Sequence, residues 1–238
     1  MSLLLHAITP PEAGIRPPEG LRGHPLVCTQ QEGLAAWATA FPDKPEQLTR
    51  ADLLAHHELV SRLDERLDSM LPARLPTWVS DLDALERLLV ARRGALLANL
   101  ERVRGRTELA ITALWVSAEP EPPAFRFAPR GSLAAGAATP GTRYLLQRRQ
   151  VFAGSDQRRA LAQQLADDLE RLAAPDLAEM QRQVCPSQGV ALSAALLVAR
   201  PSAIEVKARI GRVAQDVRIL VNGPWPPYTF AVIGTSEA

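Results

Sequence analysis

The stretch NGPWPPYTF, Asn222 to Phe230, places three prolines, a glycine, a tryptophan and a tyrosine within nine residues. Proline fixes φ near −65° and pushes the residue before it towards extended geometry. A polyproline turn takes three residues, so Trp225 and Tyr228 should project on the same side of it. Gly223 permits a sharp turn just ahead of this corner. The stretch therefore predicts a rigid corner, which either closes a core or presents a surface to a partner.

We expect Trp225 of this corner to be mostly buried. It follows the strand-like run DVRILV, over 216–221, and it stands in a stiff backbone. Large aromatic side chains in such positions usually complete a core. We expect the indole to hold the last strand against the helices, with YTFAVIG, over 228–234, as a further strand.

Upstream, residues 1–80 show alternating strand and helix signals. LLLHAIT is typical of a buried strand, and PLVCTQQEGLAAWATAF of two strands around a turn at 31–33. Thr49 and Asp52 form a capping box for a helix that should run to Leu71 and stop at Pro72. Pro76 demotes the following ARLPTWV to an edge strand. These signals predict a small ferredoxin-like α+β domain.

Residues 81–238 predict a second α+β domain, in which helices pack on a small sheet. The expected elements are, in order, a helix over 81–103 capped by Ser80 with Asp83, a strand over 106–116, a Pro/Ala-rich mobile loop near 119–141, a helix opening at 142–152 and continuing past Ser155, a buried strand over 189–199, and a helix opened by Ser202 with Glu205.

Composition excludes several classes of protein. The formal net charge of +1 argues against a dedicated nucleic-acid binder, and the chain is 47% hydrophobic, as soluble globular proteins are. Two cysteines, Cys28 and Cys185, are too few for a disulfide framework. The longest apolar stretch, over 189–199, is shorter than the roughly 18 residues that cross a bilayer. We therefore expect a cytoplasmic protein that binds neither nucleic acid nor membrane.

Few residues suit catalysis or metal binding. His56, His57 and Glu58 are consecutive, but adjacent helical residues point in different directions and cannot share one ligand sphere. We expect one packed and one solvated histidine, and small apolar roles for Cys28 and Cys185. The sequence thus predicts neither catalytic activity nor a tightly bound metal or cofactor. A cluster of arginines is typical of a solvated helix face, with anion binding as the alternative: Arg143, Arg148, Arg149, Arg158 and Arg159.

The proline corner resembles a family signature. GPWPPYTF is similar to the C-terminal motif of the gas vesicle protein F/L family, usually written GPWPPYSF, with Thr229 in place of the serine. Weaker matches follow in the right order along almost the whole chain, among them LLLHAI, DLLAHHELV, MLPARLPTWV and GRTELAI. One departure is LPARLPT, where the family tends to have Leu-Pro-Leu-Arg-Phe-Gly; Arg74 is kept.

The resemblance implies a two-domain α+β accessory or minor component of gas vesicle formation. Such proteins are thought to contact the small hydrophobic shell subunit and to assist its assembly, in the cytoplasm or on the gas vesicle. The motif residues, structural or partner-binding, are Arg74, Gly223, Pro224, Trp225, Pro226, Pro227 and Tyr228. A small-molecule-binding or enzymatic domain is the alternative, because ferredoxin-like folds host many functions.

Overall fold

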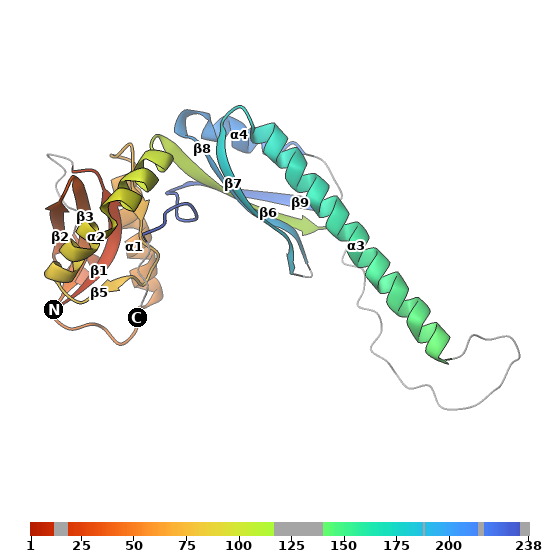
Figure 1. Ribbon diagram of the computed structural model, residues 1–238, viewed down its shortest axis with the longest axis horizontal. Coiled ribbons are helices and arrows are strands. Elements are labelled where there is room, and N and C mark those ends of the chain that lie inside the picture. The colour runs from red at the N-terminus through yellow and green to blue at the C-terminus, as the bar shows by residue number, and fades with distance from the viewer. Residues whose placement is uncertain (12–18, 117–139, 188, 214–216, 234–238) are drawn as a thin grey trace, which may run out of the picture.

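The computed structural model describes residues 1–11, 19–116, 140–187, 189–213 and 217–233, and within 140–155 the backbone alone. Two separate antiparallel sheets, each covered by helices, make up the described chain (Figure 1). The predicted α+β class is confirmed.

The first sheet contains five strands: β1 (Ser2–Thr9), β2 (Leu26–Gln31), β3 (Leu34–Phe41), β4 (Leu71–Pro72) and β5 (Trp78–Val79). Its order is β2-β3-β1-β4, and β5 pairs with β1 on the same side as β4. The predicted hairpin of β2 and β3 and the buried strand β1 are confirmed. The element order is β-β-β-α-β-β-α, which departs from the regular β-α-β-β-α-β of a ferredoxin-like domain.

Helices α1 (Arg50–Asp64) and α2 (Leu82–Val103) cover opposite faces of this sheet. Leu3 and Leu5 of β1 share a core cluster with leucines of α2, whereas Leu4 shares one with Leu59 and other residues of α1. A strand that is covered on both faces has no polar side. This double cover explains why the run LLLHAIT lacks alternation.

The second sheet contains four strands in the order β7-β8-β6-β9: β6 (Arg106–Trp115), β7 (Leu177–Ser187), β8 (Val190–Ala199) and β9 (Val217–Trp225). Helices α3 (Pro140–Ala173) and α4 (Ala203–Ile210) lie on one face and share its core cluster. The expected helix through Ser155 is confirmed, as are strands β6 and β8. Figure 1 shows α3 projecting well beyond the sheet. The region 119–139, expected to be a loop, lies outside the described residues.

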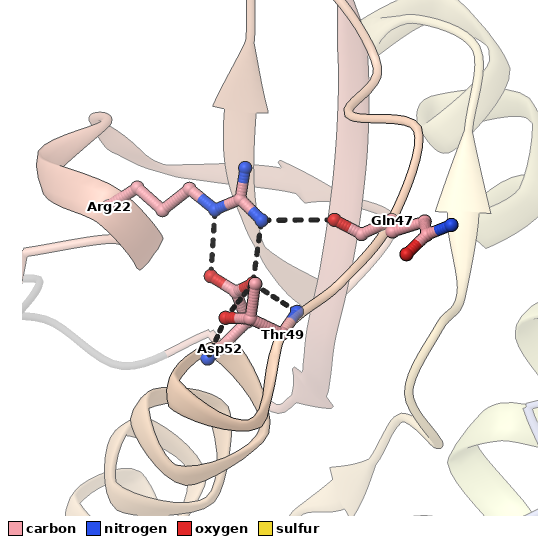
Figure 2. A network of polar contacts seen from close by, with 4 residues as sticks. All are labelled: Arg22, Gln47, Thr49 and Asp52. Atoms are coloured by element: carbon pink, nitrogen blue, oxygen red, sulfur yellow. Dashed lines mark hydrogen bonds and ion pairs between the residues drawn. The ribbon is translucent and has the colours of Figure 1, made fainter.

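A polar network fixes the start of α1 (Figure 2). Thr49 and Asp52 form the predicted capping box, with the Thr49 N–H donating to Asp52 Oδ2 at 2.6 Å. Arg22, from a short turn at Leu21–Gly23, donates to both carboxylate oxygens of Asp52 at 2.8 and 2.6 Å and to the Gln47 carbonyl at 3.1 Å. These bonds hold the pKa of Asp52 well below its usual range. The network ties the loop before β2 to the first turn of α1.

The predicted end of α1 is wrong. The helix ends at Asp64 instead of Leu71, although the periodic residues Leu67 and Met70 are buried. Leu71 and Pro72 pair with Ile8 and Ala7 of β1, and this pairing requires extended backbone. The apolar spacing therefore continues through a segment that leaves the helix.

Two of the predicted capping boxes do not form, although Ser202 does precede α4 as its N-cap. The N-cap of α2 is Asp81, which accepts the Ala84 N–H at 2.7 Å, while Ser80 donates to the Asp81 carboxylate. Ser202 makes no capping hydrogen bond with α4, because it is already helical at φ −91° and ψ −6° in a preceding turn at Arg200–Ser202.

The end of the second sheet also differs from prediction. Strand β7, which sequence patterns did not indicate, forms a hairpin with β8. Residues 228–233, expected to be a strand, form a turn and irregular backbone. Phe230 and Ile233 lie beyond the end of the second sheet, in the core cluster that contains Leu3 and Leu5 of the first sheet. The chain therefore returns to its N-terminal half after the proline corner.

Candidate functional site

The proline corner lies at the end of β9, where the register against β6 shifts between Glu108 and Ala110. Gly223 adopts φ +112°, and its peptide bond to Pro224 is cis. A Cβ atom at Gly223 would lie 2.7 Å from the Glu108 carbonyl oxygen, which is closer than Cβ contacts normally come. Both the left-handed backbone and this close approach require glycine.

Hydrogen bonds hold the corner at each end. The Thr107 hydroxyl donates to the Trp225 carbonyl at 2.8 Å, and the Lys207 ammonium donates to the Gly223 carbonyl at 2.9 Å. Beyond the prolines, the buried Glu108 carboxylate accepts both the N–H and the hydroxyl of Thr229 at 2.7 Å. Serine would supply the same two donors at position 229, so the exchange of serine for threonine keeps the contact.

Trp225 does not have the predicted burial. Its side chain is 38% exposed at the edge of β9, and its ring meets His57 edge-on with centroids 5.1 Å apart. Phe230, which is 0% exposed, holds the end of the chain against the helices instead. Both aromatic rings of the three-residue spacing nevertheless lie beside α1. The ring centroid of Tyr228 is 6.5 Å from that of His56.

The two adjacent histidines have different surroundings, as their directions on a helix predict. His57 is half-buried beside Trp225, whereas His56 is buried, with its Nδ1 atom 2.8 Å from Nδ1 of His6. His6 Nε2 lies 2.7 Å from the Thr39 hydroxyl. Burial lowers the pKa of His6 to about 3 and that of His56 to about 4. Both imidazoles are therefore neutral near pH 7.

Glu58 is exposed and pairs with Arg62 on α1, away from His56. Within the part of the chain that the structure describes, no three His, Cys, Asp or Glu side chains are grouped to hold a metal ion. The His6–His56 contact thus joins β1 to α1 through a hydrogen bond between two neutral rings.

A partly buried ion pair joins the two halves of the molecule beside this corner. Arg200, at the end of β8, donates to the Asp64 carboxylate at 2.6 Å and to the Asp64 carbonyl at 2.7 Å, at the end of α1. Burial raises the pKa of Asp64, and the charge of Arg200 opposes this rise. Burial also raises the pKa of Tyr228, and the negative charges of the nearby Asp64 and Glu108 raise it further.

Arg74 is exposed in the connection between β4 and β5. This connection borders a groove of about 280 Å³ whose other wall is the segment after the proline corner; its lining is Pro72, Arg74, Thr77, Thr229, Ala231, Val232 and Ile233. The structure therefore brings Arg74 close to the end of the motif, from which it is separated by more than a hundred residues of sequence.

The other predicted candidates lie far from this site. Cys28 is exposed on β2, which contradicts a filler role, whereas Cys185 is partly buried in β7 at φ +50°. Arg158 is half-buried and Arg159 exposed on α3; the side chains of Arg143, Arg148 and Arg149 lie outside the described residues. Sequence reasoning missed five polar residues, which carry no local motif because their partners are distant in sequence: His6, Thr39, Asp64, Glu108 and Arg200.

Fold and site together define an α+β protein of two antiparallel sheets. The two halves meet at a group of residues that we call the junction: Trp225 and Tyr228 beside His57 and His56, His6 behind His56, and the pairs Asp64–Arg200 and Glu108–Thr229. No described helix is long and apolar enough to cross a membrane. A family model described as gas vesicle synthesis protein GvpL/GvpF matches residues 2–232, and the chain belongs to this family.

Relatives and solved structures agree with this assignment. Gas vesicle protein L from a Streptomyces species is 30% identical over 98% of this chain and 94% of its own length. Gas vesicle protein L2 from Halobacterium salinarum is 29% identical over 75% of this chain and 70% of its own length. The crystal structure of GvpF from an Anabaena species shares the fold, with a TM-score of 0.73 and 16% identity over 100% of this chain and 98% of that one. The crystal structure of GvpF from Microcystis aeruginosa shares the fold as well, with a TM-score of 0.71. It is 18% identical in sequence, and the match covers 97% of this chain and 99% of that one.

Proposed function

We propose that this protein is an accessory or minor structural factor of gas vesicle formation, which binds the hydrophobic shell subunit in the cytoplasm and assists nucleation and assembly. The observation that carries the proposal is the family match over residues 2–232. A subunit that buries its apolar faces only on polymerising needs a partner that shields them beforehand. Apolar contact at roughly 25 cal/mol per Å² provides this shielding without a cofactor.

The distribution of apolar side chains supports a binding role. On α1, Leu53 is 52% exposed and Leu54 61% exposed, and Trp225 adds a further exposed ring beside His57 on the same helix. Clustered apolar side chains on a protein surface commonly mark an interaction site.

The proposal gives this chain no catalytic step. The polar groups of the junction are paired with one another: Glu108 with Thr229 and Asp64 with Arg200. Such pairs position structural elements.

Co-expression with a gas vesicle shell-subunit gene from the same organism, followed by capture of the tagged protein, tests the proposal. We expect the shell subunit to co-purify at low salt and at about 1 M NaCl, where the Debye length is about 3 Å, because apolar contact dominates. Deletion of the gene should reduce vesicle number, and the intact gene should restore it. Absence of co-purification together with normal vesicles in the deletion strain would overturn the proposal.

A further inference from the structure

The free edge of β2 is unprotected, unlike the other edges of the two sheets. Edge strands expose N–H and C=O groups that pair with another chain unless charges, prolines, bulges or short length prevent it. Strands β4 and β5 are only two residues long, β7 carries Arg182 and Pro186, and β9 carries Arg218 and Pro224. Strand β2 has six residues, and its sequence LVCTQQ contains neither a charge nor a proline. Within the described chain, its only strand neighbour is β3.

Every second residue of β2 points its backbone N–H and C=O groups away from β3. The turn at 32–33 has a positive φ at both residues, as two-residue hairpin turns require. The pair that flanks such a turn exchanges hydrogen bonds, and bonded pairs then alternate with non-bonded pairs along the ladder. Pro25 continues the bonded series, because its carbonyl accepts the Ala40 N–H at 3.0 Å. The residues whose groups face outward are therefore Leu26, Cys28 and Gln30.

Helix α2 holds this edge in place. The buried Thr29 donates its hydroxyl to the Glu86 carboxylate at 3.0 Å. At the hairpin turn, Arg93 of α2 donates to the Glu32 carbonyl at 2.9 Å. An edge that is already ordered pairs with another strand at a lower entropic cost than a flexible one.

We propose that two copies of this chain pair through their β2 edges, antiparallel and about a twofold axis at Cys28. In this register Cys28 lies opposite the partner's Cys28, and Leu26 lies opposite the partner's Gln30, so the outward-facing backbone groups of both strands are paired. A charge at the centre of such a strand would lie opposite its own copy, and like charges that face each other are destabilising. The uncharged sequence of β2 avoids this repulsion. The inference goes beyond the proposed function and does not depend on it.

The same register supplies apolar side chains to a groove beside α2. This groove of about 570 Å³ borders the end of β2, and its lining is Gln31, Asp83, Glu86, Arg87, Val90 and Ala91. Val27 packs on the α2 side of its own sheet. Because opposite residues of an antiparallel pair point to the same face, the partner's Val27 and the partner's Pro25 lie on the α2 side next to Gln31. There they meet Val90, which is 53% exposed in the single chain. One chain therefore carries both surfaces of the interface.

Sedimentation velocity of the full chain over a range of protein concentrations, under reducing conditions, tests the proposal. We expect a dimer that dissociates on dilution. Cys28→Lys places two like charges opposite each other at the axis and should raise the dissociation constant about tenfold or more. The matched control is Gln183→Lys on the edge strand β7, which should dimerise as the parent does. Because Cys28 and Gln183 are both exposed, both variants should keep the parent melting temperature. Cys28→Ser should also dimerise, which separates strand pairing from a disulfide.

A pair of opposite charges tests the register. An equimolar mixture of Cys28→Lys and Cys28→Asp should form a heterodimer, because lysine then faces aspartate across the axis; general damage to the edge would not be repaired in this way. Amide hydrogen exchange of the parent protein, followed by NMR, gives a second measurement. The N–H groups of Cys28 and Gln30 should exchange more slowly in the dimer than in the dilute monomer. The Thr29 N–H, which faces β3, should be protected in both.

Two results would overturn the inference: a parent protein that is monomeric at every concentration, and a dimer that Cys28→Lys leaves as stable as before. If the parent is monomeric and Cys28→Lys loses capture of the co-expressed shell subunit, the edge pairs with the shell subunit and not with a second copy. Failure of dimerisation leaves the proposed function standing, because capture of the shell subunit is measured separately.

Discussion

At the scale of single residues, the junction depends on groups whose surroundings leave no alternative side chain. Gly223 combines a left-handed backbone with a carbonyl oxygen where its Cβ would extend. His6 and His56 are buried rings that must remain neutral. The sequence alone predicts neither property, because each depends on contacts with residues from distant parts of the chain.

Gly223→Ala should destabilise the protein by roughly 2–4 kcal/mol, because alanine strains the positive φ and contacts the Glu108 carbonyl oxygen. Urea unfolding measures the change. Gly94→Ala is the matched control: Gly94 lies in α2 with open space around its Cα, so alanine should stabilise by about 0.5–1 kcal/mol. Equal effects of the two substitutions would contradict the assigned role of Gly223.

The buried histidines predict sensitivity to acid. In the folded protein the pKa is about 3 for His6 and about 4 for His56, against 6.5 for an ordinary imidazole. Between pH 6.5 and about 4 the unfolded chain therefore binds more protons. The free energy of unfolding should fall as the pH is lowered, by roughly 1.4 kcal/mol per pH unit for each imidazole.

Urea unfolding at several pH values between 4.5 and 7.5 measures this slope. His6→Gln removes one of the titrating groups, so its slope should be clearly smaller, whatever its stability at pH 7. His57→Gln, at the half-buried neighbour, should keep most of the parent slope. A parent protein whose stability does not change over this range would show that the pair is not buried as described.

At the scale of elements, features that depend on neighbours within a few residues follow the sequence prediction more closely than features that depend on distant strands. The Thr49–Asp52 box and the hairpin turn at 31–33 depend on neighbours within a few residues, and both form as predicted. The end of α1 depends on β1, more than fifty residues away, which recruits Leu71 and Pro72. Strand β7 has a polar sequence and is an edge strand, so its pairing with β8 had no local signal.

The cap of α2 gives a direct comparison of the two predictions for one helix. Asp81→Ala should cost about 1 kcal/mol, because the Ala84 N–H loses its acceptor. Ser80→Ala should change stability by less than about 0.5 kcal/mol, since Ser80 is exposed and caps no backbone group. Thermal unfolding of both variants distinguishes the two residues. A larger loss of stability for Ser80→Ala than for Asp81→Ala would show that Ser80 is the N-cap, as predicted from the sequence.

At the scale of the whole molecule, each sheet draws its strands from one side of Ser80, while the core crosses this position. Strands β1 to β5 precede it and β6 to β9 follow it. The division into residues 1–80 and 81–238 stays a prediction, and we propose it for the strands alone. Leu197 of β8, Phe230 and Ile233 share a core cluster with β1. The same holds for the site: Arg74 and the proline corner were found from their motif, but the groove that Arg74 shares with Thr229 depends on the fold.

Phe230→Ala should destabilise the protein by roughly 3–5 kcal/mol, because it leaves a cavity between β1, α2 and the end of the chain. Hydrogen exchange should quicken in β1 and in β8, since both contribute to that core. Val232→Ala is the control from the same segment, and its exposed side chain should leave exchange in both strands unchanged. Faster exchange in β8 alone would show that Phe230 does not support the first sheet.

The return of the chain to its first sheet also has a consequence for synthesis on the ribosome. Leu3 and Leu5 emerge among the first residues, but Phe230 and Ile233, which complete their core, emerge last. At about 5–20 residues per second, translation of the intervening residues takes roughly 10–45 s. During that interval the nascent sheet offers an unfilled apolar layer to chaperones and proteases. A chain whose synthesis ends before Ile233 leaves these apolar side chains exposed. Proteases should therefore degrade such truncated chains faster than full-length chains, whose core is complete.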